Sequence, residues 1–185
     1  TLSMAFHFTP LRLPGVVLIQ PAMYRDERGF FKETFRASEF ETQVPGPFVQ
    51  DNLANSEAGV LRGLHFQLAP KAQGKLIQVI TGEIFDVAVD LRRSSPTFGE
   101  WVGTPLSEET GQLLWIPPGF AHGYAVGSEG ANVVYKVTEE YDPTLDRGIR
   151  WDDPQLGIDW PIRAPILSDK DRALPLLSET ADLFE

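Results

Sequence analysis

The 185-residue sequence contains no cysteine, only two methionines and three histidines, and few basic residues. Without cysteine there is no disulfide, no thiolate nucleophile and no zinc–thiolate site. The chain has 26 acidic side chains against 16 basic ones and a formal net charge of −10, which argues against a broad nucleic-acid-binding surface. The apolar N-terminal stretch is broken by Pro10, Arg12 and Pro14, so we predict no signal peptide and no membrane segment. The missing cysteines fit a cytoplasmic location.

Glycine and proline, in contrast, are plentiful. The 16 glycines and 15 prolines interrupt the sequence so often that only a few short helices are expected. Twelve phenylalanines and four tryptophans supply bulk for a core, and a chain of this length buries about two-thirds of the surface that its unfolded form exposes. No repeat or low-complexity linker divides the sequence. We therefore predict a single all-β domain over residues 1–185.

Short runs rich in β-branched and aromatic residues predict strands over 16–20, 29–35, 60–67, 75–80, 84–91, 112–116, 123–126 and 131–137. Thr81, Gly82 and Glu83 separate two of these runs and predict a hairpin turn. In the run after the turn, every second residue is apolar, and the opposite face carries Asp86 and Asp90. That face is expected to border water or a polar cavity. Strands this short and frequent are typical of a sandwich or barrel.

Two motifs about fifty residues apart carry the chemistry. In the first, Gly59 is followed by five residues and then by His65-Phe66-Gln67; in the second, Gly111 is followed by five residues and then by the segment 117–122, which ends in His122. Together they resemble the two halves of a cupin signature, which implies a cupin-type double-stranded β-helix, or jelly roll. Where a metal-binding cupin has a second histidine this chain has Gln67, and no carboxylate follows in residues 68–74. We therefore expect no metal, and a neutral His65 that is available as a general base.

The three histidines differ in what the pattern predicts for them. His7 lies in an unpatterned segment and is expected at the surface. His122 either donates a hydrogen bond to a neighbour such as a carboxylate or contacts the substrate directly. His65 has Arg62 and Lys75 on flanking segments, and an imidazole near cations beside a cavity is an arrangement that catalysis uses.

Many segments, in the same order, resemble the dTDP-4-dehydrorhamnose 3,5-epimerase family over residues 8–177. The matching segments are 25–33, 48–52, 59–67, 73–76, 82–91, 95–99, 116–123, 135–138 and 167–171. The resemblance implies a jelly-roll homodimer without metal or cofactor. It also implies conversion of dTDP-4-dehydro-6-deoxy-D-glucose to dTDP-4-dehydro-L-rhamnose by removal and return of protons at C3 and C5, which the C4 ketone acidifies.

The resemblance assigns four catalytic positions. His65 matches the family's base and Asp171 its carboxylate partner, which holds the imidazole tautomer. Lys75 matches the cation near the C4 oxygen, where it favours an enolate over a ketone. Tyr135 matches the proton donor on the opposite face of the sugar. From the pattern alone, Asp171 is predicted in a solvated turn and Tyr135 in the core or at its rim.

The resemblance also implies a substrate-binding set, in which cationic groups suit a diphosphate. It comprises Arg28, Glu33, Gln50, Asn52, Arg62, Lys75, His122, Tyr141, Asp146 and Lys170. Residues 1–35 are expected to pack in part against the dimer partner, so that Arg28 and Glu33 act in its site. Tyr141 either stacks on the thymine or has a packing role. Asp146 occupies a position where glutamate is common in the family.

Three alternatives remain open from the sequence. Relatives in deoxysugar pathways for antibiotics keep the same four catalytic side chains yet invert one carbon only. A metal-dependent cupin dioxygenase needs His65 and His122 to be joined by a third ligand, and its activity would depend on added metal. A nucleotide-sugar binding module needs Arg28 and Arg62 but makes no use of His65 as a base.

Overall fold

The computed structural model describes residues 5–185, so the first four residues of the predicted domain lie outside the described part. The elements are β1 (Phe6–Pro10), β2 (Val17–Pro21), β3 (Met23–Asp26), β4 (Gly29–Lys32), α1 (Ala37–Phe40), β5 (Gln50–Ser56), β6 (Leu61–Gln67), β7 (Lys75–Asp90), β8 (Trp101–Ser107), β9 (Leu113–Ile116), β10 (Phe120–Val137), β11 (Asp146–Gly148), α2 (Asp169–Arg172) and a 3-10 turn at Leu177–Glu179. Across the described residues, no helix has the length and apolar character needed to cross a membrane.

The predicted all-β class is confirmed, with corrections to individual strands. The run at 29–35 is shorter than predicted, since β4 ends at Lys32. The sequence pattern does not predict β1, β3, β5, β8 or β11. In β5 the reason is clear, because its sequence QDNLANS is mostly polar and its side chains alternate between exposed and half-buried positions.

The predicted hairpin turn at 81–83 is wrong. Residues 75–90 form the single strand β7, and residues 120–137 form the single strand β10, which pairs with β7 along nearly its whole length. At the predicted turn Gly82 faces Ala131, and the register between the two strands shifts on either side of this pair. Both strands therefore continue through a shared irregularity. Residues 81–83 therefore mark an irregularity and not a turn. Each half of β7 pairs with β10, and the two halves of β7 do not pair with each other.

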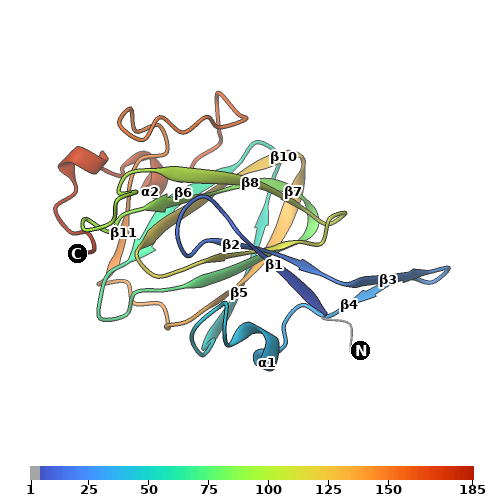
Figure 1. Ribbon diagram of the computed structural model, residues 1–185. Coiled ribbons are helices and arrows are strands. Elements are labelled where there is room, and N and C mark those ends of the chain that lie inside the picture. Colours follow the sequence, from blue (N-terminus) through green and yellow to red (C-terminus); the bar gives the residue numbers. More distant parts are fainter. Residues whose placement is uncertain (1–4) are drawn as a thin grey trace.

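The two long strands contribute to both layers of the fold. One half of β7 pairs with β8 and the other half with β9, while β10 pairs with β6 and β5 in the same way. One layer therefore contains β8, β7, β10, β6 and β11, and the other contains β1, β2, β9, β7, β10 and β5. Figure 1 shows these strands wrapped around a common interior, with the β3–β4 hairpin projecting away from them. This is the predicted cupin-type jelly roll.

Three apolar clusters pack against the two layers. The first fills the interior and includes Ile77, Ala88 and Val133; the second lies outside the β8 layer, under the C-terminal segment; and the third lies outside the β9 layer, where Phe40 of α1 packs near Trp115. The predicted alternation in β7 is confirmed, because its apolar face at 85–91 lies in the second cluster. The opposite face turns inward, and Asp86 and Asp90 on it are fully buried.

Gly63 controls how closely β6 and β10 approach. It has a positive φ of 110°, and a Cβ atom there would lie 2.7 Å from both the Gly123 Cα and the His122 carbonyl oxygen. Only glycine fits such a backbone contact without displacing the main chain. Two residues further on, His65 faces His122 across the two strands. The close approach at Gly63 thus brings the two sequence motifs together.

We expect Gly63→Ala to lower the free energy of unfolding by about 3 kcal/mol or more, because the new methyl group adds overpacking to conformational strain. Gly29→Ala is the matched control, since Gly29 has a similar φ of 127° but a Cβ atom added there would meet nothing within 4 Å. It should cost about 1–2 kcal/mol. Urea unfolding of both variants provides the comparison, and equal losses would show that the close approach contributes nothing.

Candidate active site

The centre of the site is a contact between His65 on β6 and Asp171 on α2. The His65 Nε2 lies 2.6 Å from Asp171 Oδ1. The segment 168–171, which the pattern alone predicts as a solvated turn, is a capped helical turn in which Ser168 Oγ accepts a hydrogen bond from the Asp171 amide, and Asp171 is only 3% exposed. Burial raises the pKa of Asp171, but its hydrogen bonds to His65 and Ser168 outweigh this and hold the pKa below its ordinary value. Asp171 is therefore an anion beside the imidazole.

An anionic partner at Nε2 selects the tautomer of His65. The carboxylate accepts a hydrogen bond from the Nε2–H group, so the lone pair of the neutral ring is on Nδ1. The His65 side chain is 29% exposed, whereas that of Asp171 is 5% exposed. The arrangement thus buries the orienting carboxylate and leaves the base accessible.

A cavity of about 290 Å³ surrounds this pair. It is lined by Ala54, Arg62, His65, Lys75, His122, Gly123, Tyr124, Tyr135, Ser168, Lys170 and Asp171. A larger cavity of about 650 Å³ lies elsewhere, but Glu83 is the one charged residue among its described lining residues. Concentration of titratable groups, and not size, identifies the smaller cavity as the candidate site.

Lys75 and Tyr135 line this cavity from β7 and β10. Burial lowers the pKa of Lys75 to about 8, against the opposing attraction of Asp146 and Asp86. Burial also raises the pKa of Tyr135, and the nearby Arg62 offsets this only in part. At neutral pH the cavity therefore holds an ammonium and a protonated phenol, that is, a cation and a proton donor. The half-buried position of Tyr135 at the rim agrees with the pattern-based expectation.

His122 is held by Asp86, a residue that the sequence patterns do not assign to the site. His122 Nε2 lies 2.8 Å from Asp86 Oδ2, and both residues are buried. Burial lowers the pKa of His122 and raises that of Asp86. The carboxylate-bound alternative for His122 is thus confirmed, while the ring also lines the cavity. The sequence signal for Asp86 is the alternation in residues 84–91, which places it on the face opposite the apolar side chains.

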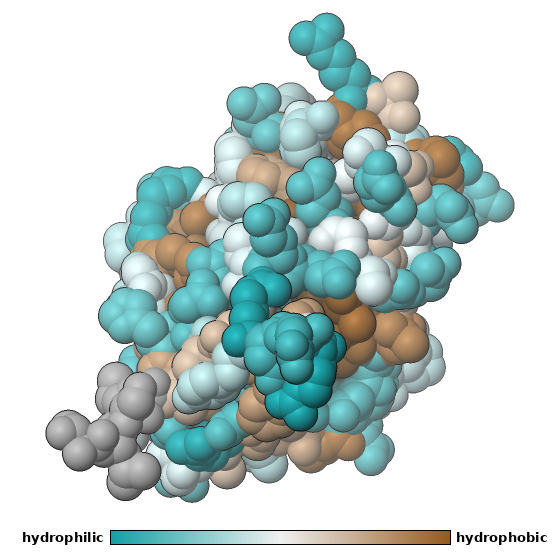
Figure 2. Space-filling model, turned by 90° about the vertical axis from the view of Figure 1, so that its right-hand side faces the viewer, coloured by the Kyte–Doolittle hydropathy of each residue, from teal (hydrophilic) through white to brown (hydrophobic). Residues whose placement is uncertain are grey.

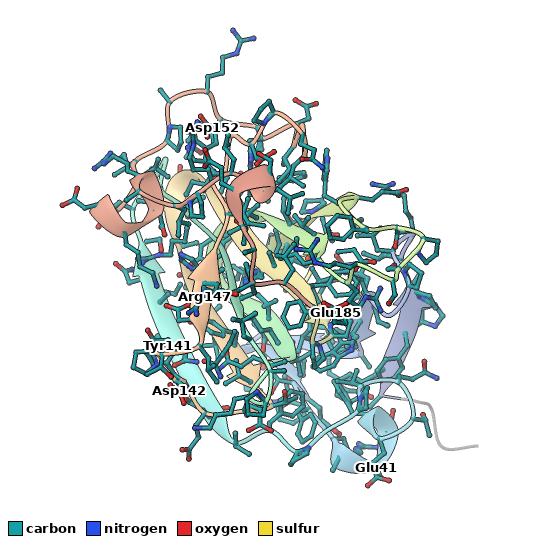
Figure 3. The ribbon with its side chains drawn as sticks, turned by 90° about the vertical axis from the view of Figure 1, so that its left-hand side faces the viewer. Glu41, Tyr141, Asp142, Arg147, Asp152 and Glu185 are labelled. Carbon is teal, nitrogen blue, oxygen red and sulfur yellow. The ribbon has the colours of Figure 1, made fainter. Side chains whose placement is uncertain are left out.

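A second group of predicted residues lies beside the cavity. Asp146 Oδ2 accepts hydrogen bonds from Lys170 Nζ and, at 3.1 Å, from the Tyr141 hydroxyl. Gln50 donates to Asn52 Oδ1 and accepts from the Tyr141 amide, each at 2.9 Å. Figure 3 shows Tyr141 at the margin of the molecule, beside β5. These five residues form one polar rim. Although aspartate is shorter than the glutamate that is common at this position in the family, Asp146 contacts both Lys170 and Tyr141.

Arg28 and Glu33 do not reach the cavity of their own chain. Arg28 is exposed on the projecting hairpin, where it pairs with Asp26, and Glu33 pairs with Arg36. His7, as predicted, is exposed. Arg62, in contrast, lines the cavity, and its Nε donates to Ser56 Oγ at 2.8 Å.

Gln67, which replaces a cupin metal ligand, binds the backbone of neighbouring loops. Its Nε2 donates to the carbonyl oxygens of Lys71 and Glu140, and its Oε1 accepts from the Asp142 amide at 2.9 Å. Within residues 5–185, no three histidine, aspartate or glutamate side chains gather where a metal ion could bind. Gln67 therefore joins the backbones of the loops at residues 71 and 140–142.

A jelly roll with an oriented imidazole, an ammonium and a phenol around one cavity defines a class of protein, the cupin-type barrels equipped for proton transfer. The family model for dTDP-4-dehydrorhamnose 3,5-epimerase matches residues 10–179. The chain is 53% identical over 161 residues to the dTDP-4-dehydrorhamnose 3,5-epimerase of Shigella flexneri, covering 86% of this chain and 89% of the relative.

A solved structure and a more distant relative are also dTDP-sugar epimerases. The chain superposes with a TM-score of 0.90 and 47% identity on a dTDP-6-deoxy-D-glucose-3,5-epimerase of Legionella pneumophila in complex with dTDP-4-keto-L-rhamnose, covering 94% of each chain. It is 38% identical over 175 residues to the dTDP-4-dehydrorhamnose 3-epimerase of Streptomyces niveus, covering 94% of this chain and 84% of that relative. The chain belongs to the dTDP-4-dehydrorhamnose 3,5-epimerase family. It is an isomerase that acts on a dTDP-linked sugar.

The lowered pKa of Lys75 predicts an alkaline limit to activity. Because the group is charged below its pKa of about 8 and neutral above it, kcat/KM should fall as the pH rises through this value. Lys75→Arg keeps a charge at all accessible pH values, so its residual activity should lose this limb. A pH–rate profile of both proteins tests the assignment, and an unchanged limb in the variant would assign the titration to another group.

Proposed function

We propose that this cavity inverts both C3 and C5 of dTDP-4-dehydro-6-deoxy-D-glucose and yields dTDP-4-dehydro-L-rhamnose. The observation that carries the proposal is the His65–Asp171 contact, which directs a basic nitrogen into a cavity that also contains Lys75. In the substrate the C4 ketone acidifies the hydrogens on both neighbouring carbons. Nδ1 of His65 removes such a proton, and Asp171 stabilises the imidazolium that forms. We place the reaction in the cytoplasm, where nucleotide precursors are found.

Lys75 stabilises the enolate. Proton loss at C3 or C5 moves negative charge onto the C4 oxygen, and an ammonium beside that oxygen binds the enolate more strongly than the neutral ketone. The partly desolvated position that lowers the pKa of Lys75 also strengthens this attraction. The positive charge of Lys75 therefore lies beside the oxygen on which the negative charge develops.

Tyr135 returns the proton on the opposite face. Its pKa is raised by burial, so the phenol is protonated and able to donate to the carbanion. Donation to the face opposite His65 inverts the carbon, whereas return of the proton by His65 restores it. The substrate loses one proton to His65 and gains one from Tyr135, so no redox cofactor is needed. His65 then releases its proton to solvent and Tyr135 takes one up, which restores both groups.

The polar rim binds the nucleotide end. Arg62 and Lys170 supply positive charge for the diphosphate, His122 supports the hexose from inside the barrel, and Gln50, Asn52, Tyr141 and Asp146 surround the thymidine. Tyr141 is 54% exposed, so its ring is accessible for stacking on the thymine.

We further propose a homodimer in which Arg28 and Glu33 complete the partner's site. The β3–β4 hairpin exposes Tyr24 and Phe31, which is 66% exposed, and Leu53 on β5 is 69% exposed. Large apolar side chains exposed in this way favour burial in an interface. Figure 2, which views the molecule from the side where the hairpin projects, shows a hydrophilic projection with hydrophobic surface beside it. An exposed Arg28 on this projection is placed to reach another subunit.

Proton NMR in deuterated water tests the reaction and its regiochemistry. The protein should exchange the substrate hydrogens at both C3 and C5 for deuterium, and His65→Ala should reduce both rates by about 10²–10⁴-fold. His7→Ala is the control, because that histidine is exposed and remote from the cavity. Exchange at one carbon only would assign a single-carbon epimerase, as in the Streptomyces relative. No exchange at either carbon would favour a binding module, and loss of activity on chelation would favour a metal enzyme.

Subunit mixing tests whether Arg28 acts in the partner's site. Arg28→Ala and His65→Ala should each be nearly inactive alone. In mixed dimers one site of the two combines an intact His65 with an intact Arg28, so random exchange should restore about a quarter of the wild-type activity. If Arg28 served its own chain's site, every site in the mixture would lack one of the two groups and no activity would return.

A further inference from the structure

A polar chain inside the barrel connects Arg62 to a second phenol in the cavity. Arg62 Nε donates to Ser56 Oγ at 2.8 Å, and Ser56 Oγ lies 3.4 Å from the Tyr124 hydroxyl. Ser56 and Tyr124 are each 3% exposed. Tyr124 lies on β10, where it faces Arg62 of β6 on one side and Asp86 of β7 on the other. Its ring packs in the interior cluster, and the residue lines the same cavity as His65 and Tyr135.

Arg62 is the fixed donor at the head of this chain, and the hydrogen between Ser56 and Tyr124 can lie on either hydroxyl. A guanidinium only donates, so Ser56 Oγ is the acceptor for Arg62. Ser56 has one hydroxyl hydrogen to give, and the Tyr124 oxygen is in range of it. If Ser56 donates to Tyr124, the hydrogen of the Tyr124 hydroxyl remains for a ligand, and the described residues provide no other hydrogen-bond partner for that group. In this arrangement, Arg62 at the head of the chain polarises both hydroxyls.

We propose that Tyr124 donates a hydrogen bond to the hexose of the substrate, at the C2 hydroxyl. This inference rests on the proposed function, in which Arg62 binds the diphosphate. The diphosphate is attached to C1, and Tyr124 is one hydroxyl further from Arg62 along the chain. The hexose hydroxyl next to C1 is that of C2, which takes no part in the reaction. A contact at C2 holds the ring while both C3 and C5 are exposed to the same base.

This contact makes Tyr124 a specificity-determining residue. A buried phenol that has lost its ligand partner carries a desolvation penalty, so the site disfavours a hexose without the C2 hydroxyl. Tyr124→Phe removes the donor and with it the penalty. The two changes, at the enzyme and at the substrate, therefore remove the same hydrogen bond and should not be additive.

The experiment is a four-way comparison of wild type and Tyr124→Phe, each with the dTDP-linked 4-keto-6-deoxyhexose and with its 2-deoxy analogue. We expect kcat/KM of the wild type to fall about 10-fold on the analogue, and the variant to lose about 10-fold on the natural substrate. On the analogue the variant should equal or exceed the wild type. Equal losses by the variant on both substrates would overturn the proposal and make Tyr124 a core residue only.

Two further readouts separate the possible failures. Urea unfolding of Tyr124→Phe should show a stability close to that of the wild type. If that variant does not fold, Ser56→Ala takes its place, because it removes the hydroxyl that connects Arg62 to Tyr124. Ser56→Ala should lower the preference for the natural substrate, measured as its kcat/KM divided by that of the 2-deoxy analogue. An unchanged preference would overturn the proposal. Normal C3 and C5 exchange by the wild type, combined with a failed four-way comparison, would reject only this inference and leave the proposed function standing.

Discussion

The pairing of β7 with β10 is the interaction on which the rest of this structure depends. The two strands are hydrogen-bonded from Lys75 opposite Val137 to Asp90 opposite Phe120, and each continues from one layer of the jelly roll into the other. Because the pair passes through both layers, its inward face is also the wall of the cavity. Lys75, Asp86, His122 and Tyr135 all come from these two strands. The strand pairing that builds the barrel therefore also brings these four side chains together.

The C-terminal segment completes the cavity from outside the barrel. Ile166 forms a bridge with Val60, and its backbone exchanges hydrogen bonds with Gly59 and Leu61. This attachment lies three residues before Asp169, where α2 begins, and restricts where Asp171 meets His65. Elsewhere in the segment, the buried Asp153 accepts hydrogen bonds from backbone amides, among them that of Leu177 at 2.6 Å. The segment that carries Asp171 is thus attached by backbone pairing at Ile166 before α2 and by the Leu177–Asp153 hydrogen bond after it.

Burial sets the charge state of the cavity. The same desolvation that lowers the pKa values of Lys75 and His122 raises those of Tyr135 and Asp86. Asp171 differs, because hydrogen bonds to its charged form outweigh burial. The two imidazole–carboxylate pairs are therefore unlike: one combines a buried anion with an accessible base, and the other is enclosed. This difference is the reason for our proposal that His65, and not His122, removes the proton.

Much of this protein is determined by the sequence itself. Strand periodicity and the two glycine–histidine motifs predict the jelly roll, the inward face of β7 and the importance of His65, because side-chain alternation and local turn chemistry are properties of neighbouring residues. Local pattern also fails in identifiable places: it predicts a turn at Gly82, where partner strands keep β7 continuous, and a solvated turn at Asp171, which packing buries. The Asp86–His122 contact, the chain from Arg62 to Tyr124 and the lowered pKa of Lys75 were decided only by the tertiary structure, since each depends on atoms far apart in the sequence and on their removal from water.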